Sequence, residues 1–266
     1  MTVAGPALTI GIWQDSGTPG DVAANLAAIS RAAAVSAQGG IELLVFPECF
    51  LTGYLNPDRA GEIALQAGKD SIVCLQGIAS KYSIALLVGL YEYRTGEIYN
   101  AAMLIGADGR ILATYRKRIL YGAWERSVFT PGKDSVLIEY MGITIAILIC
   151  FDLEFPELAR ECAKKGADLI AVPTALMAPH ERVACHIVPA RAIENQVYIA
   201  YANRTGREQD AVFVGRSSIW DPCGRQLAHG SDGGPELLSA RVIKSRLTAA
   251  RADMCYLDEV KLLCPG

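Results

Sequence analysis

Residues 143–160 read ITIAILICFDLEFPELAR, an apolar run followed by a helix with clear start and stop signals. Residues 143–149 are apolar and rich in β-branched side chains, which is typical of a strand buried on both faces. Pro156 suits the first position of a helix, Glu157 suits its positive first turn, and Gly166 suits the residue after its end. The pattern therefore predicts a strand, a tight turn at Cys150 and a helix.

Cys150 stands at the carboxyl end of the predicted strand, on the turn into the helix. Enzymes with α/β folds place nucleophiles at this point, because a strained turn exposes the side chain above the sheet. The alternative interpretation is a buried structural cysteine, since free cysteine is among the most buried residue types. The turn by itself leaves both interpretations open.

The composition excludes several classes of protein. A chain of 266 residues with 52% hydrophobic and 20% charged residues suits a globular protein with a substantial core. The formal net charge of -3 and the lack of a basic tract argue against a nucleic-acid partner. No apolar run reaches the roughly 18 residues of a membrane span, and the N-terminus lacks the basic region of a signal peptide. We expect neither membrane nor nucleic-acid binding.

The eight cysteines are expected to be free thiols in a reducing cytoplasm, because no secretory signal precedes them. No two cysteines form a CxxC motif. Cys185, His186 and His180 are the residues closest to a metal-ligand grouping, but solvated histidines explain them more simply. The sequence therefore predicts a cytoplasmic protein that needs no metal and no cofactor.

The rest of the chain alternates predicted strands and helices, as a layered α/β fold requires. Helical spacing predicts helices at residues 21–38, 71–82 and 181–194, the last broken by Pro189. Residues 116–132 are expected to form a functional loop, and residues 250–266 a tail without a core of its own. Similar patterns in both halves predict two similar halves packed as one domain. Further strands are predicted at residues 8–13, 41–46, 84–93, 99–105, 110–115, 168–172, 197–202, 212–220, 225–229 and 237–242.

Two charged residues share the position of Cys150, each directly after a predicted strand. Glu48 follows the strand at 41–46, and Lys117 follows the strand that ends at residue 115. If the strands are neighbours with one direction, all three side chains meet at one edge of a sheet. A buried carboxylate can then take the proton of the thiol, and a lysine can stabilise an oxyanion. A solvated Lys117 within the basic run 116–118 is the alternative.

Three blocks of sequence resemble the signatures of the nitrilase superfamily of carbon–nitrogen hydrolases. They are Phe46-Pro47-Glu48 with Gly53-Tyr54, Tyr115-Arg116-Lys117 with Leu120, and Cys150-Phe151-Asp152 with Phe155-Pro156-Glu157. Three blocks in this order at the ends of three strands are specific. The resemblance covers nearly the whole chain and favours the catalytic interpretation of Cys150.

The resemblance implies a fold and an assembly. The fold is α/β, a four-layer αββα sandwich formed by residues 1–250 as a single carbon–nitrogen hydrolase domain. Residues 251–266 are then a C-terminal tail at an oligomer interface. Members of the superfamily commonly dimerise through the helices after the cysteine turn, so a homodimer or higher homo-oligomer is expected.

The resemblance also implies roles for individual residues. Cys150 is the nucleophile, Glu48 the general base, and Lys117 the stabiliser of the oxyanion together with the backbone N–H of Phe151. Glu125 matches a second glutamate that positions the substrate or the lysine, and the alternative for Glu125 is a surface partner of Arg126. Substrate binding is predicted for Tyr54, Trp124, Phe151, Glu154, Thr174 and Ala175.

Two positions depart from the pattern of many members: Ile119 replaces a histidine, and Glu154 replaces an arginine. One interpretation of Glu154 is that it favours the N-terminus of the following helix, by about 0.3–1 kcal/mol. The other is that its carboxylate faces the pocket, where it repels acidic substrates and tolerates neutral or amine-bearing amides.

These observations predict an amidase that hydrolyses small aliphatic or amino-substituted carboxamides to a carboxylic acid and ammonia through a cysteine thioester. A nitrilase or an N-carbamoyl amide hydrolase with the same triad is the alternative. Phe151 stands where nitrilases usually carry tryptophan, and Glu154 stands where carbamoylases usually show a basic residue. A non-catalytic binding protein on this fold is the alternative from another class.

Overall fold

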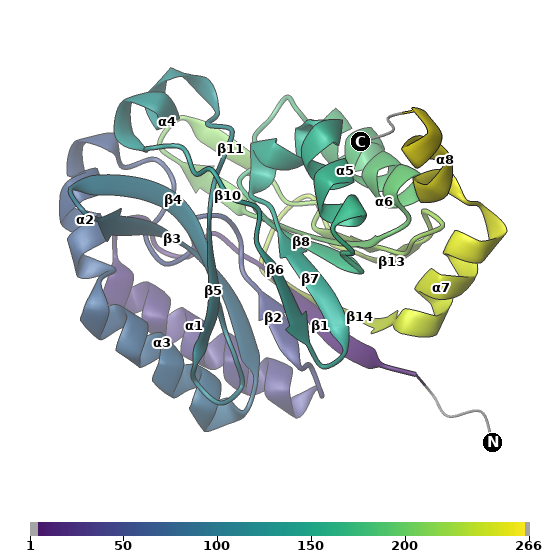
Figure 1. The fold of residues 1–266 in the computed structure, drawn as a ribbon. Helices are drawn as coiled ribbons and strands as arrows, with labels where there is room; N and C mark the ends of the chain where they lie inside the picture. The colour runs from purple at the N-terminus through teal and green to yellow at the C-terminus, as the bar shows by residue number, and fades with distance from the viewer. Residues whose placement is uncertain (1–4, 264–266) are drawn as a thin grey trace.

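Two six-stranded sheets face each other in the computed structural model, which describes residues 5–263 (Figure 1). The first sheet has the spatial order β14 (Glu236–Ile243), β1 (Ala7–Gln14), β2 (Leu43–Val45), β3 (Ala85–Arg94), β4 (Glu97–Ile105) and β5 (Ile111–Arg116). The second has the order β13 (Gln226–His229), β12 (Ser218–Trp220), β9 (Tyr198–Asn203), β8 (Leu169–Thr174), β7 (Ile143–Ile147) and β6 (Leu137–Tyr140).

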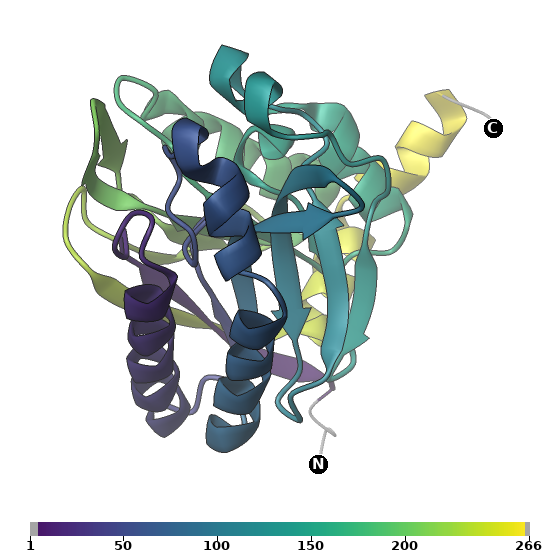
Figure 2. The same cartoon turned by 90° about the vertical axis from the view of Figure 1, so that its left-hand side faces the viewer.

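Helices cover the outer face of each sheet. α1 (Val22–Gln38) and α3 (Lys69–Tyr82) pack on the first sheet, and α5 (Pro156–Lys164) and α6 (Val188–Asn195) pack on the second (Figures 1 and 2). A short 3₁₀ turn, η1 (Pro57–Arg59), leads into α2 (Ala60–Gln66) beside β3. The predicted four-layer αββα sandwich is therefore confirmed.

Alternating side chains of the central strands fill two different cores. Leu43 and Val45 of β2 lie in the core between the sheets, whereas Leu44 packs with the side chains of α1 and α3. The period of two along a strand places successive side chains on opposite faces. Because both faces are covered, β2 reads as a continuous apolar run, as parallel strands inside α/β proteins do.

The two halves repeat one strand arrangement. In each sheet three parallel strands lie side by side, β1–β2–β3 in one and β7–β8–β9 in the other. An antiparallel strand borders each set on one side, and two antiparallel strands border it on the other. The expectation of two similar halves is confirmed in topology. The last strand, β14, returns to pair with β1, from Ala7 opposite Ile243 to Gln14 opposite Glu236.

The stretch predicted as one strand at residues 212–220 is instead two strands in different sheets. β11 (Ala211–Val214) forms a separate two-stranded ribbon with β10 (Thr205–Glu208), and β12 joins the second sheet. Gly215 and Arg216 between them have φ values of 61° and 55°. This left-handed conformation turns the chain out of the extended state, and an apolar pattern does not reveal it.

Two other predicted segments also differ. The loop at residues 116–132 contains a helix, α4 (Gly122–Val128). The helix at 181–194 consists of a π-helical turn, η3 (Val183–Ile187), that leads into α6. Pro189 lies in the first turn of α6, where a missing N–H costs no helical hydrogen bond, so it starts this helix rather than breaking one.

The predicted tail at 250–266 is helical where the structure describes it, and residues 264–266 lie outside the described part. α7 (Lys244–Asp253) runs across the predicted boundary at residue 250, and α8 (Tyr256–Leu263) follows. Leu247 and Ala250 are buried, and Gln196 Nε2 donates a hydrogen bond to Ala250 O at 2.8 Å. The tail therefore packs on the domain through α7.

Gly89 in β3 permits a close approach of the turn that follows β2. A Cβ atom at residue 89 would lie 2.4 Å from the backbone nitrogen of Cys49 and 2.6 Å from the carbonyl oxygen of Pro47. Both contacts are shorter than van der Waals separation and involve backbone, which cannot rotate away. Glycine at this position therefore sets the distance between β3 and the turn that carries Glu48.

We expect Gly89→Ala to destabilise the protein by about 1–3 kcal/mol, the usual effect of forcing extra volume into a packed core. Gly77→Ala in α3 is the matched control, because a Cβ there has no heavy atom within 4 Å. That control should stabilise the helix by about 0.5–1 kcal/mol. Chemical denaturation of both variants measures the difference, and equal stability of the two would contradict the close approach.

Candidate active site

Glu48, Lys117 and Cys150 come together where the two sheets meet. The strands that precede Glu48 and Lys117, β2 and β5, lie in the first sheet with β3 and β4 between them. The strand that precedes Cys150, β7, belongs to the second sheet. The expectation of three neighbouring strands at one sheet edge was therefore wrong. The site is instead shared by two facing sheets, which enclose it from water.

Lys117 is fully buried and holds two carboxylates. Its Nζ donates to Glu48 Oε1 and to Glu125 Oε1, both at 2.7 Å, and all three side chains are 0% exposed. Burial by itself would lower the pKa of Lys117, but the two carboxylates hold that pKa well above its ordinary value. Lys117 is therefore an ammonium at neutral pH, and its interpretation as a solvated residue is wrong.

One carboxylate oxygen of Glu48 accepts hydrogen bonds, and the other accepts none from the described residues. Oε1 accepts hydrogen bonds from Lys117 Nζ and, at 2.7 Å, from Asn100 Nδ2. Oε2 is buried and has no hydrogen-bond partner among the described residues. Burial raises the pKa of Glu48, and the charge of Lys117 opposes that rise. A carboxylate with a raised pKa and an open acceptor is suited to take up a proton.

Cys150 opens a short 3₁₀ helix, η2 (Cys150–Glu154), three residues after β7 ends at Ile147. Its φ is 46°, in the left-handed region that strains a residue other than glycine. Burial raises the pKa of Cys150 well above the ordinary value, and the charge of Glu48 adds to this. The sulfur is therefore a thiol at neutral pH, and it needs a base before it can act as a nucleophile.

Glu125 is a buried member of the network and not a surface partner of Arg126, which instead donates to the carbonyl oxygen of Gly122. Besides Lys117, Glu125 Oε1 accepts from Tyr54 Oη at 2.7 Å. Glu125 Oε2 accepts from the backbone N–H of Tyr121 at 2.7 Å. These bonds anchor α4 to the lysine and fix the direction of the Tyr54 ring.

Asp152 joins the lysine strand to the cysteine turn, a role that the sequence analysis did not assign. Oδ1 accepts from the backbone N–H groups of Arg118 at 3.2 Å and Ile119 at 2.8 Å. Oδ2 accepts from Ile149 N at 3.1 Å and Tyr115 Oη at 2.8 Å. Burial raises the pKa of Asp152 to about 6. Its position two residues after the cysteine, in a quoted sequence block, was the available signal.

A buried arginine supports the glutamate turn from the second half of the chain. Arg204 is 0% exposed, and its Nη1 donates to Glu48 O at 3.2 Å. Its Nη2 pairs with Glu208 Oε2 at 2.9 Å. Glu208 Oε1 in turn accepts the backbone N–H groups of Tyr54 at 2.9 Å and Leu55 at 2.7 Å. No local pattern in the sequence distinguishes Arg204 from a surface arginine.

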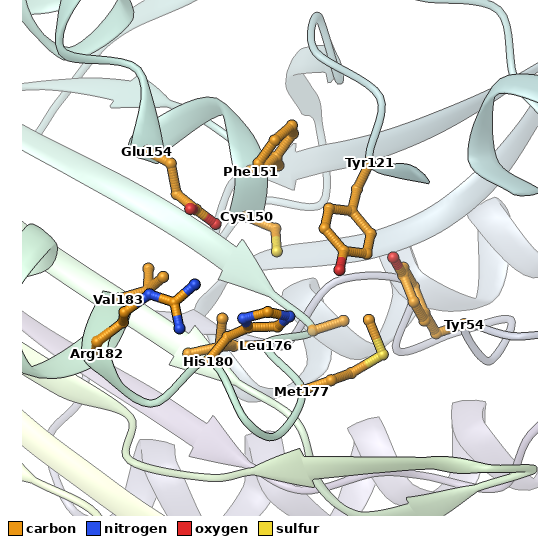
Figure 3. Close-up of a pocket in the computed structure, with 11 residues that line it drawn as sticks. Tyr54, Tyr121, Cys150, Phe151, Glu154, Leu176, Met177, His180, Arg182 and Val183 are labelled. Carbon is orange, nitrogen blue, oxygen red and sulfur yellow. The ribbon is translucent and has the colours of Figure 1, made fainter. Parts of the chain in front are cut away.

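A cavity of about 200 Å³ opens above Cys150 (Figure 3). Of the residues predicted to bind substrate, Tyr54, Phe151, Glu154 and Ala175 line it. Six further lining residues were not predicted, namely Tyr121, Leu176, Met177, His180, Arg182 and Val183. Their signal is weak, because they lie in the segments between β5 and α4 and from the end of β8 to the start of η3, where sequence patterns are least regular.

Two predicted substrate-binding residues do not line this cavity. The ring of Trp124 packs edge-on against Tyr54 with centroids 5.0 Å apart, and so lies behind a lining residue. The main chain of Thr174 supports the glutamate turn, because its carbonyl oxygen accepts from Glu48 N at 3.3 Å. Its hydroxyl donates to Val172 O at 3.1 Å. Both residues support the site from outside the cavity.

Within residues 5–263, no group of three or more His, Cys, Asp or Glu side chains is placed to hold a metal ion. In that same range no helix is both long enough and apolar enough to cross a membrane.

Comparison with known proteins places the chain in a family. The family described as carbon-nitrogen hydrolase matches residues 9–252. A protein named "Hydrolase in pqqF 5'region" from Pseudomonas protegens is 41% identical over 83% of this chain and 78% of its own length. An (R)-stereoselective amidase from a Pseudomonas species is 33% identical over 97% of this chain and 93% of its own. The crystal structure of an amidase from a Nesterenkonia species superposes with a TM-score of 0.86 at 34% identity, covering 95% and 96% of the two chains.

Asp152→Asn should destabilise the protein, because an amide NH₂ would face two of the donors that now meet an oxygen. The expected loss is about 1–3 kcal/mol for each donor left without an acceptor. Because the pKa of about 6 lies above that of an unfolded aspartate, the contribution of Asp152 to stability falls as pH rises from about 4 to about 6. Denaturation is therefore compared at about pH 8, where the carboxylate is ionised.

The control for this comparison is Asp232→Asn, which removes an exposed ion pair with Arg216. Exposed pairs contribute about 0–1 kcal/mol. If both aspartate variants lost the same small amount of stability, Asp152 would not hold the lysine strand to the cysteine turn.

Proposed function

The chain belongs to the carbon-nitrogen hydrolase family, and on that premise we propose that it hydrolyses small carboxamides to a carboxylic acid and ammonia. One observation carries the proposal. The Cys150 thiol opens onto a cavity beside a buried cluster in which Lys117 holds two carboxylates and Glu48 keeps one oxygen free. This arrangement supplies a nucleophile, a base and a fixed positive charge without a histidine.

The first half of the reaction forms a thioester. Cys150 Sγ attacks the amide carbon while Glu48 Oε2 takes the proton of the thiol. An ammonium has three N–H donors, and two of those on Lys117 bind Glu48 and Glu125, so the third is free for the developing oxyanion. The backbone N–H of Phe151 donates no hydrogen bond within the described chain, and it can serve the same oxygen. The C–N bond then breaks as Glu48 returns the proton to the leaving nitrogen.

The second half of the reaction uses water. Glu48 takes a proton from a water molecule that attacks the thioester carbon, and the C–S bond breaks. The proton passes to the sulfur, which restores the thiol and releases the carboxylic acid. Atoms balance over the cycle as amide plus water to acid plus ammonia.

Related structures support an amide as the substrate class. A variant of the Nesterenkonia amidase was solved in complex with butyramide. Another variant shows the acetamide moiety of fluoroacetamide added covalently at its active-site cysteine. In this chain, Phe151 rather than tryptophan follows the nucleophile. Butyramide is therefore a suitable first substrate, and butyronitrile and N-carbamoyl-β-alanine test the nitrilase and carbamoylase alternatives.

We propose one catalytic domain over residues 1–250 and a homodimer or higher homo-oligomer formed through α5, α6 and residues 251–266. The outward side chains Ile193 and Tyr256 in this region are 40% and 37% exposed, which suits an apolar contact. A cytoplasmic location is supported by the cysteines of the described chain, all of which are free thiols.

Cys150→Ala should abolish ammonia release from butyramide and leave the unfolding transition in place. Acid-quenched wild-type enzyme with a slow amide should carry an acyl group on the peptide that contains Cys150, seen by mass spectrometry. An amide is preferred to a general electrophile, because Cys74, Cys185, Cys223 and Cys255 are exposed and would react with one. Acylation of Cys49 with Cys150 unmodified would refute the assignment, and Cys49→Ala is the control.

Glu48→Gln removes the proton acceptor with little change in volume, and it should slow turnover by about 10²–10⁴-fold. Lys117→Arg should slow it by about 10²–10³-fold, the effect of losing one oxyanion donor, because a planar guanidinium does not replace a compact ammonium. Arg118→Lys, on the neighbouring residue that pairs with Glu161 on the surface, is the control. Near-normal kcat/KM in Lys117→Arg would show that the lysine has only a structural role.

A further inference from the structure

We infer that the cavity selects amides whose far end carries both an ammonium and a carboxylate, such as the side-chain amides of amino acids. The inference rests on the proposed amidase function and adds a substrate class to it. It comes from Glu154 and Arg182, two side chains of opposite charge that line the same cavity as Cys150.

Figure 3 shows the guanidinium of Arg182 turned toward the carboxylate of Glu154, on the side of Cys150 opposite Tyr54 and Tyr121. The two charges are close enough for Arg182 to oppose the rise in the pKa of Glu154 that burial causes. Their charged atoms nevertheless lie more than 4.0 Å apart, so the two side chains form no direct ion pair in the described chain.

Neither charge is satisfied by another side chain. The carboxylate of Glu154 takes part in no hydrogen bond within residues 5–263, and the guanidinium of Arg182 reaches only Pro179 O, at 3.5 Å. The backbone of Glu154 is fixed, however, because Arg191 Nη2 donates to Glu154 O at 2.8 Å and Arg191 Nε donates to Leu153 O at 3.0 Å. Two unpaired and opposite charges thus face a cavity whose wall is anchored.

The pairing of charges discriminates between substrates. A substrate with only an ammonium is attracted by Glu154 and repelled by Arg182. A substrate with only a carboxylate is repelled by Glu154 and attracted by Arg182. A single charge therefore adds little to the free energy of binding. A ligand that carries both charges can place its ammonium at Glu154 and its carboxylate on the planar fork of Arg182. The presence of Arg182 therefore changes the expectation from sequence that Glu154 by itself excludes acidic substrates.

The size and lining of the cavity agree with this class. About 200 Å³ is below the roughly 300–1,000 Å³ of pockets for drug-sized ligands, so the substrate is small. Leu176, Met177 and Val183 also line the cavity and offer apolar contact to a short methylene chain. A substrate with an amide, a few methylenes and a charged α-amino acid end finds a nucleophile, apolar side chains and two opposite charges in this one cavity.

Four amides of similar length provide the test: butyramide, 4-aminobutanamide, the monoamide of glutaric acid, and glutamine. They carry no charge, an ammonium, a carboxylate, and both. Ammonia release gives kcat/KM for each. In the wild type, kcat/KM for glutamine should exceed that for butyramide by about tenfold or more. A tenfold ratio corresponds to about 1.4 kcal/mol, the size of one strong charge interaction. Neither singly charged amide should show this advantage.

Glu154→Gln and Arg182→Gln should change the ratios for the two singly charged amides in opposite directions, and both should lower the ratio for glutamine. Relative to butyramide, Glu154→Gln should lower kcat/KM for glutamine and 4-aminobutanamide and raise it for the glutaric monoamide. Arg182→Gln should lower kcat/KM for glutamine and the glutaric monoamide and raise it for 4-aminobutanamide. Arg59→Gln and Glu62→Gln neutralise an exposed ion pair on η1 and α2 and should leave every ratio as in the wild type.

The outcomes separate the two proposals. One outcome is that butyramide is hydrolysed but glutamine has no advantage in kcat/KM. Another is that each cavity variant changes kcat/KM for all four amides by the same factor. Either result overturns the selection of a doubly charged end and leaves the amidase function standing. If none of the four is hydrolysed and Cys150 carries no acyl group, the amidase function is overturned and this inference with it. Hydrolysis of glutamine in preference to butyramide, lost in both variants, supports the two together.

Discussion

The ammonium of Lys117, buried between two carboxylates, is the interaction on which the site depends. An isolated buried charge is very costly, and removing one member of a buried ion pair typically destabilises a protein by about 3–5 kcal/mol. Lys117 therefore requires Glu48 and Glu125, and both must stay within hydrogen-bond distance, which is 2.7 Å for each. Burial, together with the charge of Glu48, raises the pKa of the nearby Cys150 thiol, so the sulfur stays protonated until a base accepts its proton.

Several buried groups outside this cluster hold its members at the required distances. Asp152 links the chain after the lysine strand to the cysteine turn, and Arg204 with Glu208 links the glutamate turn to the loop that carries Tyr54. Gly89 sets the spacing between β3 and the glutamate turn. Each of these contacts joins segments that are far apart in the chain, so the geometry of the site is a property of the folded domain.

The groups that carry out the reaction and the groups that select the substrate differ in burial. Glu48, Lys117 and Glu125 are fully buried between the facing sheets, and Glu48 Oε2 keeps no hydrogen-bond partner among the described residues. Glu154 is half-buried and Arg182 is exposed, and neither charge forms an ion pair in the described chain. Fixed interactions among the buried groups suit the reaction itself, whereas charged side chains without an ion-pair partner suit recognition of one particular end of the substrate.

The sequence by itself determined the layered α/β fold and the strand-turn-helix at Cys150, because these depend on local periodicity and helix signals. The resemblance of three sequence blocks pointed to Glu48, Lys117 and Cys150 as one group. It also identified Glu125, Tyr54 and Glu154 as residues near the site. Only the tertiary structure decided that the triad spans two sheets, that residues 212–220 change sheet, and that Asp152, Arg204 and Arg182 face the site or support it. These depend on strand order and on side-chain direction in loops, which bring together residues up to 156 positions apart. A single sequence carries no periodic signal for contacts of that range.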